Sequence, residues 1–176
     1  MYDLLLLSML LDGPKHGYQL KREAGWIMGQ EALHNNLVYP MLRGFLEEGW
    51  VSKKAVPGER GQTRQQYALT AEGRRSLLGR LNRFSESDAS SESAFHLRVG
   101  LLATIKPGAR ETILALRQNH LQDRYQTLAA LQARMDLGKF GGEVVGHMRK
   151  QIEMECEWIR HLSRIARADT RNKEDE

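Results

Sequence analysis

Four polar side chains between residues 35 and 43 have types and a spacing that suit contact with DNA. They are Asn35, Asn36, Tyr39 and Arg43. The last three stand three and four positions apart, so a helix would place them on one face. In the major groove an asparagine can pair with adenine and an arginine with guanine, while a tyrosine can touch a phosphate or a thymine methyl group. A plain core helix is the other interpretation, but the apolar stripe of this segment leaves out Asn36, Tyr39 and Arg43.

A basic segment at residues 57–64 supplies a second set of candidate contacts. The residues in it that we assign to DNA contact are Arg60, Gln62, Thr63 and Arg64. A solvated turn would explain them in isolation, but beside a DNA-reading helix we expect phosphate or minor-groove contact. Lys15 and His16 precede another expected helix, where we assign them a phosphate contact. Lys53 and Lys54 fit phosphate contact and solvent-facing charge equally well.

The sequence shows no pattern typical of catalysis or of metal binding. His147, Cys156 and His161 share one expected helix, but their spacings of nine and five residues do not place ligands on one face. The sequence contains no glycine-rich phosphate loop, no nucleophile elbow and no paired catalytic acids. Cys156 lies near an apolar stripe and is expected to be a small buried hydrophobe. We therefore expect no enzyme activity, no cofactor and no metal site.

The helix that carries the DNA-contacting residues is expected over residues 37–48, with Asn36 as its N-cap and Gly49 as its end. Pro40 would then be the fourth helical residue. Because the first four N–H groups of a helix have no internal partner, a proline there costs no hydrogen bond, and its fixed φ suits the helix. The bare helix start can approach a phosphate or a base edge.

The elements around this helix outline a winged helix-turn-helix. Helices are expected over residues 2–12 and 17–28 and again after Thr70, which is the expected N-cap of the last one. In the second helix, the residues expected to face the core are Tyr18, Leu20, Ala24 and Ile27. Before Thr70, two alternating segments flank a tip that contains glycine and proline, which is typical of a β-hairpin. The fold class is therefore mainly α with a small β-hairpin.

Charge is distributed unevenly along the 176 residues, whose net charge is +4. Residues 1–83 hold 12 Lys/Arg and 8 Asp/Glu, whereas residues 84–176 hold 14 of each. A basic half joined to a neutral half suggests that one part meets a polyanion and the other meets protein. The sequence shows no secretory signal and no membrane-spanning stretch, and the single Cys156 cannot form an intrachain disulfide. We therefore expect a cytoplasmic protein.

Two domains are expected on either side of a serine-rich segment. Residues 85–93 are expected to form a linker or a string of helix caps. A DNA-binding domain would cover residues 1–84 and a helical dimerisation domain residues 94–168. Residues 169–176 are expected to form a frayed tail.

Two long amphipathic helices are expected within the second domain, over residues 109–136 and 143–167. Apolar residues recur every seven positions in each of them, and heptad stripes of this length bury best against other helices. Two such helices have too little core of their own, so a second copy of the chain is the expected partner. The residues assigned to this homodimer contact are Leu114, Leu121, Leu128, Met135, Val145, Met148, Ile152, Trp158, Ile159 and Leu162.

Three blocks of the first half resemble the PadR family of bacterial winged-helix transcriptional regulators. The blocks are His16-Gly17-Tyr18, the segment from Tyr39-Pro40 to Leu46-Glu47-Glu48-Gly49, and the segment Tyr67 to Gly73. The resemblance implies that Tyr39-Pro40 begins the recognition helix and that a basic wing leads into the third block. The second half is similar in pattern to the long-tailed AphA/Vir-like branch, in which helices beyond the wing build the dimer.

These observations together predict a homodimeric, sequence-specific DNA-binding transcriptional regulator that reads a pseudo-palindromic operator. The recognition helix 37–48 would enter the major groove, and the wing 57–64 would touch the adjacent backbone. Repression is the mode that the resemblance implies. Trp26, Trp50 and Trp158 leave two interpretations open, core or interface packing and a pocket for a small aromatic effector. The alternative function is a protein-interaction module that keeps the winged helix as a scaffold and does not bind DNA.

Overall fold

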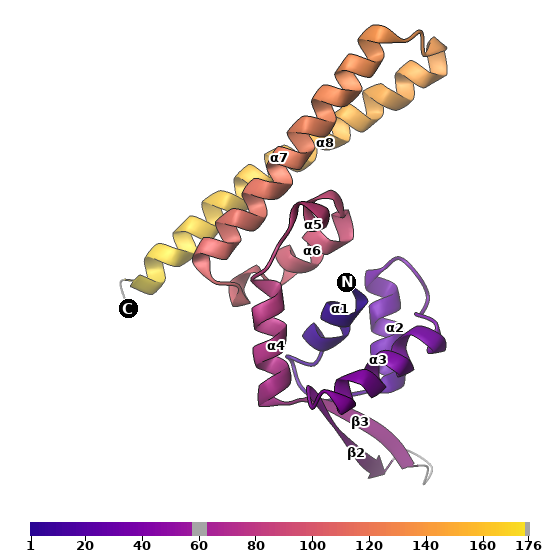
Figure 1. Cartoon of the computed structure of the whole chain (residues 1–176), viewed down its shortest axis with the longest axis vertical. Coiled ribbons are helices and arrows are strands. Elements are labelled where there is room, and N and C mark those ends of the chain that lie inside the picture. Colours follow the sequence, from indigo (N-terminus) through magenta and orange to yellow (C-terminus); the bar gives the residue numbers. More distant parts are fainter. Residues whose placement is uncertain (58–62, 175–176) are drawn as a thin grey trace. The chain divides into compact units, whose positions relative to one another are not determined.

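The computed structural model describes residues 1–57 and 63–174, with side chains up to residue 170 (Figure 1). The chain divides into two compact units, Met1–Leu81 and Asn82–Glu176.

The N-terminal unit is a winged helix. Its helices are α1 (Tyr2–Ser8), α2 (Gly17–Ile27), α3 (Asn35–Glu47) and α4 (Ala71–Leu81), and its strands are β1 (Lys15–His16), β2 (Val51–Pro57) and β3 (Thr63–Leu69). The strands form one antiparallel sheet in the order β1-β3-β2. The predicted fold class, mainly α with a small hairpin, is confirmed. The two-residue strand β1, which pairs Lys15 with Tyr67, was not expected from the sequence.

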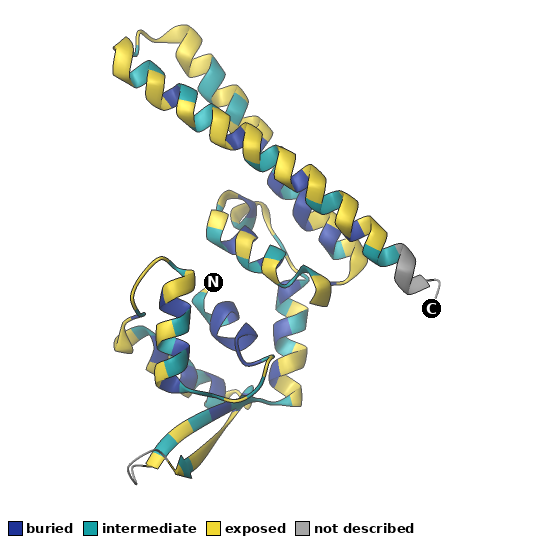
Figure 2. Ribbon diagram, turned by 180° about the vertical axis from the view of Figure 1, so that it is seen from behind, coloured by how far each residue is buried: buried dark blue, intermediate teal, exposed yellow. Residues whose placement is uncertain are grey.

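The core of this unit is built around α1. Four consecutive leucines on a helix point in every direction, and all of Leu4–Leu7 are buried, so α1 lies inside the unit (Figure 2). The helix ends at Ser8 and not at the predicted residue 12, because turns follow it. On α2, Leu20 and Ala24 are buried as predicted. The prediction was wrong for Tyr18 and Ile27, which are 45% and 63% exposed.

The junction between the sheet and α4 depends on one threonine and one glycine. The Thr70 hydroxyl accepts a hydrogen bond from the Gly73 N–H at 2.9 Å and donates to the Gly49 carbonyl at 2.7 Å, so the predicted N-cap is confirmed. A Cβ atom on Gly73 would lie only 1.9 Å from the Trp50 carbonyl oxygen. Only a glycine therefore lets the first turn of α4 pack against the backbone at the start of β2.

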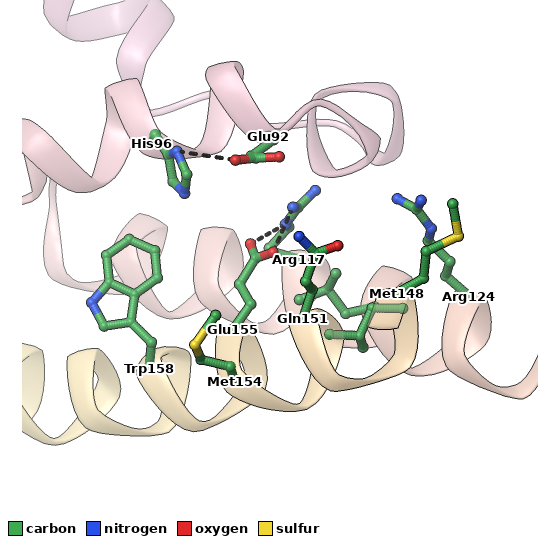
Figure 3. Close-up of a pocket in the computed structure, with 11 residues that line it drawn as sticks. Glu92, His96, Arg117, Arg124, Met148, Gln151, Met154, Glu155 and Trp158 are labelled. Carbon is green, nitrogen blue, oxygen red and sulfur yellow. Dashed lines mark hydrogen bonds and ion pairs between the residues drawn. The ribbon is translucent and has the colours of Figure 1, made fainter. Parts of the chain in front are cut away.

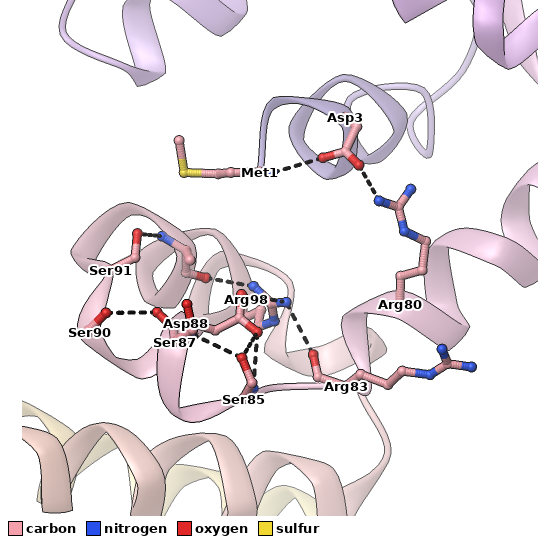
Figure 4. A network of polar contacts seen from close by, with 11 residues as sticks. Met1, Asp3, Arg80, Arg83, Ser85, Ser87, Asp88, Ser90, Ser91 and Arg98 are labelled. Carbon is pink, nitrogen blue, oxygen red and sulfur yellow. Dashed lines mark hydrogen bonds and ion pairs between the residues drawn. The ribbon is translucent and has the colours of Figure 1, made fainter.

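An ion pair joins the first and last helices of the unit. The Asp3 carboxylate binds the N-terminal ammonium at 2.9 Å and also pairs with the Arg80 guanidinium (Figure 4). Burial by itself would raise the pKa of Asp3, but the bonds from these two cations outweigh it and hold that pKa well below its ordinary value. The pair stabilises the fold at neutral pH, and this contribution is lost as the pH falls below the ordinary carboxyl range.

The C-terminal unit is entirely helical over its described residues. It consists of α5 (Glu86–Ser90), α6 (Glu92–Gly100), the short 3₁₀ helix η1 (Leu102–Thr104), α7 (Pro107–Arg134) and α8 (Gly138–Glu174). The serine-rich segment 85–93 is not an extended linker. Ser85 and Ser91 are the N-caps of α5 and α6, accepting bonds from the N–H groups of Asp88 and Ala94. The second of the two expectations for this segment, a string of helix caps, is the one that the structure shows.

Three buried arginines hold these helices together. Arg98 donates to the carbonyl oxygens of Ala94 and Arg83, both at 3.1 Å (Figure 4). Arg110 donates to the Ile105 and Ala103 carbonyls and, at 2.6 Å, to the Asp169 carboxylate of α8. The third buried arginine is Arg117. A buried guanidinium is costly unless its donors find partners, so each arginine fixes the backbone carbonyls around it.

The two long helices form an antiparallel hairpin that packs through the predicted heptad stripes. Leu114 and Leu121 of α7 are buried, as are Val145, Ile152 and Ile159 of α8. A single chain already encloses these five side chains, so they serve the contact between α7 and α8. Their assignment to a surface that meets a second copy is therefore corrected. Outer surfaces of both helices remain exposed along their length (Figure 2).

The boundaries of the hairpin also differ from the prediction. α7 ends at Arg134, and Met135, assigned above to a dimer contact, is its C-cap and 56% exposed. Gly138 adopts a φ of +60° and its N–H donates to the Asp136 carboxylate at 2.9 Å, which forms the turn. α8 then begins five residues earlier than predicted and reaches Glu174.

Two glycines of α4 provide a matched test of the junction. Replacing Gly73 by alanine should lower the free energy of unfolding by about 3 kcal/mol, because the new methyl group would overlap the Trp50 carbonyl. Replacing Gly79, whose Cβ position is open, should raise it by about 0.5–1 kcal/mol through helix propensity alone. Urea unfolding followed by circular dichroism measures both values. Equal effects at the two positions would contradict the proposed role of Gly73.

Candidate nucleic-acid interface

The outer face of α3 carries the polar residues that the sequence analysis selected. Val38, Leu42 and Phe45 are buried and fix the rotation of the helix about its own axis. Asn36, Tyr39 and Arg43 are exposed on another side of the helix, and Asn35 is exposed in its first turn. All four residues are therefore accessible to solvent along the first nine residues of α3. Tyr39 is 40% exposed, so its ring is partly packed and partly open to solvent.

The predicted start of α3 is wrong by two residues. The N-cap is His34, not Asn36, and Asn35 is the first helical residue. Pro40 is then the sixth residue of the helix, beyond the first turn. An N–H at this position would donate to the Asn36 carbonyl, so the proline does remove a hydrogen bond that the helix would otherwise contain. The Asn36 carbonyl therefore lacks this bond within the helix.

A hollow of about 390 Å³ lies beside Tyr39, where α3 meets the beginning of α2 and the strand β3. It is lined by His16, Gly17, Tyr18, Tyr39, Arg64, Gln65 and Tyr67. A Cβ on Gly17 would come within 3.0 Å of the Tyr39 ring and 3.4 Å of the Tyr67 ring. Gly17 therefore lets both tyrosines lie close to the beginning of α2. Burial raises the pKa of Tyr67, and the neighbouring Tyr39 raises it further, so its hydroxyl stays protonated.

His16 and Lys15 have structural partners that the sequence did not reveal. The His16 N–H donates to the Gln19 side chain at 2.9 Å, and its Nδ1 lies 3.1 Å from the Gln65 carbonyl oxygen, which can only accept. His16 thus caps α2 and ties it to β3. The Lys15 ammonium forms an ion pair with Glu23 at 3.0 Å. Part of its charge is compensated inside the protein, which weakens the case for a phosphate contact by Lys15.

The wing is described only in part. Arg60 and Gln62 lie outside the described residues. Thr63 is exposed, and Arg64 is half-buried with its guanidinium 5.7 Å from the centre of the Tyr18 ring. On β2, Lys53 and Lys54 are exposed. Arg64 therefore reaches the surface that also contains Tyr39, whereas the side chains of the wing tip stay a prediction.

Sequence reasoning missed two residues on this surface, Tyr18 and Arg22. Tyr18 was assigned to packing because it continues the apolar pattern of α2. The structure exposes it and places its ring 5.9 Å from that of His16. The separation of Tyr18 and Arg22 by four residues could have identified these two, because residues four apart lie on one face of a helix.

A second hollow, also of about 390 Å³, lies within the C-terminal unit (Figure 3). The side chains labelled around it are Glu92, His96, Arg117, Arg124, Met148, Gln151, Met154, Glu155 and Trp158. Arg117 makes a two-pronged pair with Glu155 at 2.8 and 3.0 Å and donates to the Ala89 carbonyl at 2.7 Å. These bonds fix a charged wall, while methionine and leucine side chains supply an apolar one.

Among the three tryptophans only Trp158 lines this hollow. Its ring meets those of Phe95 and His96 edge-on, with centroid distances of 5.9 and 5.5 Å. Trp26 is exposed beside Arg22, and Trp50 packs on Phe45. Trp26 and Trp50 both belong to the N-terminal unit and are not among the residues that line this hollow.

The described residues contain no set of three or more histidine, cysteine or acidic side chains arranged to hold a metal ion. Burial raises the pKa of the Cys156 thiol, and the charge of Glu155 adds to the rise. The thiol is therefore a poor nucleophile at neutral pH. None of the described helices combines the length and the apolar character needed to cross a membrane.

Residues 6–78 match the model of the transcriptional regulator PadR-like family. The crystal structure of TA0346 from Thermoplasma acidophilum, assigned as a transcriptional regulator, is 32% identical, with 43% of this chain and 72% of that chain covered and a TM-score of 0.41. No curated protein matches the sequence.

Two further solved structures cover more of the chain at lower identity. Bacillus subtilis PadR, solved in complex with operator DNA, is 16% identical, with 93% of this chain and 98% of that chain covered and a TM-score of 0.45. RosR from H. salinarum is 22% identical, with 58% and 88% covered and a TM-score of 0.42. The family match lies within the winged helix and ends in α4, before the C-terminal unit begins. By its N-terminal unit, this chain belongs to the transcriptional regulator PadR-like family.

Proposed function

We propose that this chain is a sequence-specific DNA-binding repressor of transcription that acts as a homodimer. The observation that carries the proposal is the exposed polar face of α3, held outward by the buried stripe of Val38, Leu42 and Phe45. A winged helix with such a face can place α3 in a major groove. B. subtilis PadR, a structural relative, has been solved on operator DNA, which supports the same role here.

Roles for the individual residues follow from their chemistry. Asn35 and Asn36 can accept from and donate to an adenine edge, and Arg43 can bind guanine with two hydrogen bonds. Tyr39 can touch a phosphate or a thymine methyl group. Thr63 and Arg64 on β3 can bind the backbone beside the groove, with Arg60 and Gln62 proposed to extend that contact.

The proposed dimer uses the outer side of α8, because the inner side is occupied by α7. Exposed residues recur there every seven positions in two columns, as in pairing helices. One column is Val144, Gln151, Trp158 and Ile165, and the other is Phe140, His147, Met154 and His161. Phe140 is 81% exposed and Met154 67%, which is unusual for large apolar side chains. A second copy pairing through these columns would be related by a two-fold axis, so the operator would be pseudo-palindromic.

An effector would bind in the hollow beside Trp158. The hollow combines an aromatic face, apolar methionines and the cationic side chains of Arg117 and Arg124. This combination suits a small aromatic molecule with an anionic group. Since the hollow adjoins α8, occupancy could alter the proposed dimer contact and with it the spacing of the two reading helices.

DNA binding is tested first by selecting sites from random duplexes with the purified protein. Arg43→Ala should weaken binding to the selected site by about 1–3 kcal/mol and relax the preference for one base pair, because the base contact is lost. Fluorescence anisotropy at several salt concentrations measures both. Wild-type affinity should fall steeply with salt. A flat salt response, or a failure to select any sequence, would favour the protein-interaction module.

Dimer formation is tested on two exposed residues of α8. The double substitution Val144→Asp and Ile165→Asp should convert a dimer into a monomer of 20.1 kDa with unchanged helix content, because both side chains are exposed within one chain. Arg160→Asp changes an exposed residue of the same helix that lies away from the two columns and should leave the dimer intact. Sedimentation velocity distinguishes the two forms. A wild-type monomer, or a variant that still dimerises, would contradict the proposed interface.

Effector binding is tested with benzoate as a small aromatic anion. Benzoate should quench tryptophan emission of the wild type and should have a much smaller effect on Trp158→Phe, which removes the indole from the hollow. The exposed Trp26 supplies the matched control, since Trp26→Phe should keep the quenching. Equal quenching of all three proteins would show that it does not arise in this hollow.

A further inference from the structure

The exposed ring of Tyr18 lies close to two cations. The guanidinium carbon of Arg22 is 6.0 Å from the ring centre, and that of Arg64 is 5.7 Å from it. Arg22 comes from the same helix one turn later, whereas Arg64 comes from β3. The electron-rich ring face attracts both guanidinium groups, so Tyr18 brings together two like charges from separate elements.

These two charges are not neutralised by the rest of the described chain. Neither Arg22 nor Arg64 forms an ion pair with a described residue, whereas the neighbouring Lys15 pairs with Glu23. Arg22 also lies 4.9 Å from the centre of the Trp26 ring. Two guanidinium groups without an ion-pair partner near one exposed ring make the local surface positive, which favours binding of an anion there. Arg22 of α2 is therefore better placed to bind an anionic ligand than Lys15 of β1, to which the sequence analysis assigned a phosphate contact.

The cluster adjoins the hollow beside α3. Tyr18 and Arg64 both line this hollow, together with the partly exposed Tyr39. The protonated hydroxyl of Tyr67 belongs to the same lining. An anionic group at its mouth would thus meet guanidinium forks and hydroxyl groups, which are the donors that phosphate oxygens prefer.

We propose that Tyr18, Arg22 and Arg64 form a binding site for one phosphodiester group of duplex DNA. The inference rests on the proposed function and adds a contact from α2 that positions the protein without reading sequence. The site lies beside the base-reading residues of α3, because Tyr39 borders the same hollow. It would anchor one DNA strand while Asn36 and Arg43 meet the bases.

The test combines protein variants with duplexes in which one phosphate is replaced by a neutral methylphosphonate. Arg22→Gln should lower affinity for the selected duplex about tenfold, the effect of losing one charged hydrogen bond, and should leave the order of base preferences unchanged. The slope of log affinity against log salt concentration should become shallower by the amount expected for about one phosphate contact. Arg74→Gln removes the same charge from an exposed position of α4 and should change affinity less than twofold.

The decisive result is the coupling between one residue and one phosphate. A single methylphosphonate position should weaken wild-type binding, yet cause no further loss for Arg22→Gln or for Tyr18→Ala. Equal losses for wild type and variants at every position would overturn the inference, as would an Arg22→Gln protein that binds like wild type. If wild type binds no duplex at all, the proposed function itself has failed. If sodium phosphate at constant ionic strength displaces DNA from wild type no better than from Arg22→Gln, a general site for free phosphate is excluded.

Discussion

The rotation of α3 about its axis is the constraint on which the whole interface depends. Val38, Leu42 and Phe45 can be buried together in only one orientation, and that orientation presents Asn36, Tyr39 and Arg43 to solvent. Burial of three such side chains contributes about 1.5–3 kcal/mol each, which far exceeds the solvation preference of the polar residues opposite them. The polar face is therefore set by the core before any DNA contact is made.

Much of the winged helix could be predicted from the sequence because its signals are local. Thr70 as N-cap, the hairpin strands and the buried Leu20, Ala24 and Leu42 all follow from capping chemistry or periodicity. The start of α3 could not be located, since both Asn35 and Asn36 resemble caps and the structure uses His34, which makes no side-chain cap hydrogen bond. The strand β1 was missed because two residues carry no periodicity.

The C-terminal unit shows what periodicity leaves undetermined. The seven-residue repeat of Ile152 and Ile159 correctly indicates a helix packed on another helix, but not whether that helix belongs to the same chain. The neutral charge of this half is equally ambiguous. Arg110 and Arg117, which count as surface charge in a sequence, are buried and pair with Asp169 and Glu155. Amino-acid composition alone does not show whether charged residues form internal ion pairs of this kind or lie on a solvated surface.

The hydrogen bond between the His16 ring and the Gln65 carbonyl connects two elements of the winged helix, α2 and β3. It fastens the first residue before α2 to the middle of β3, at a point where the two-residue strand β1 also pairs. The hydrogen bond and the β1–β3 pairing therefore couple β3 to the start of α2. A displacement of β3 would be transmitted through them to the helix whose first residue, Gly17, lies against the Tyr39 ring.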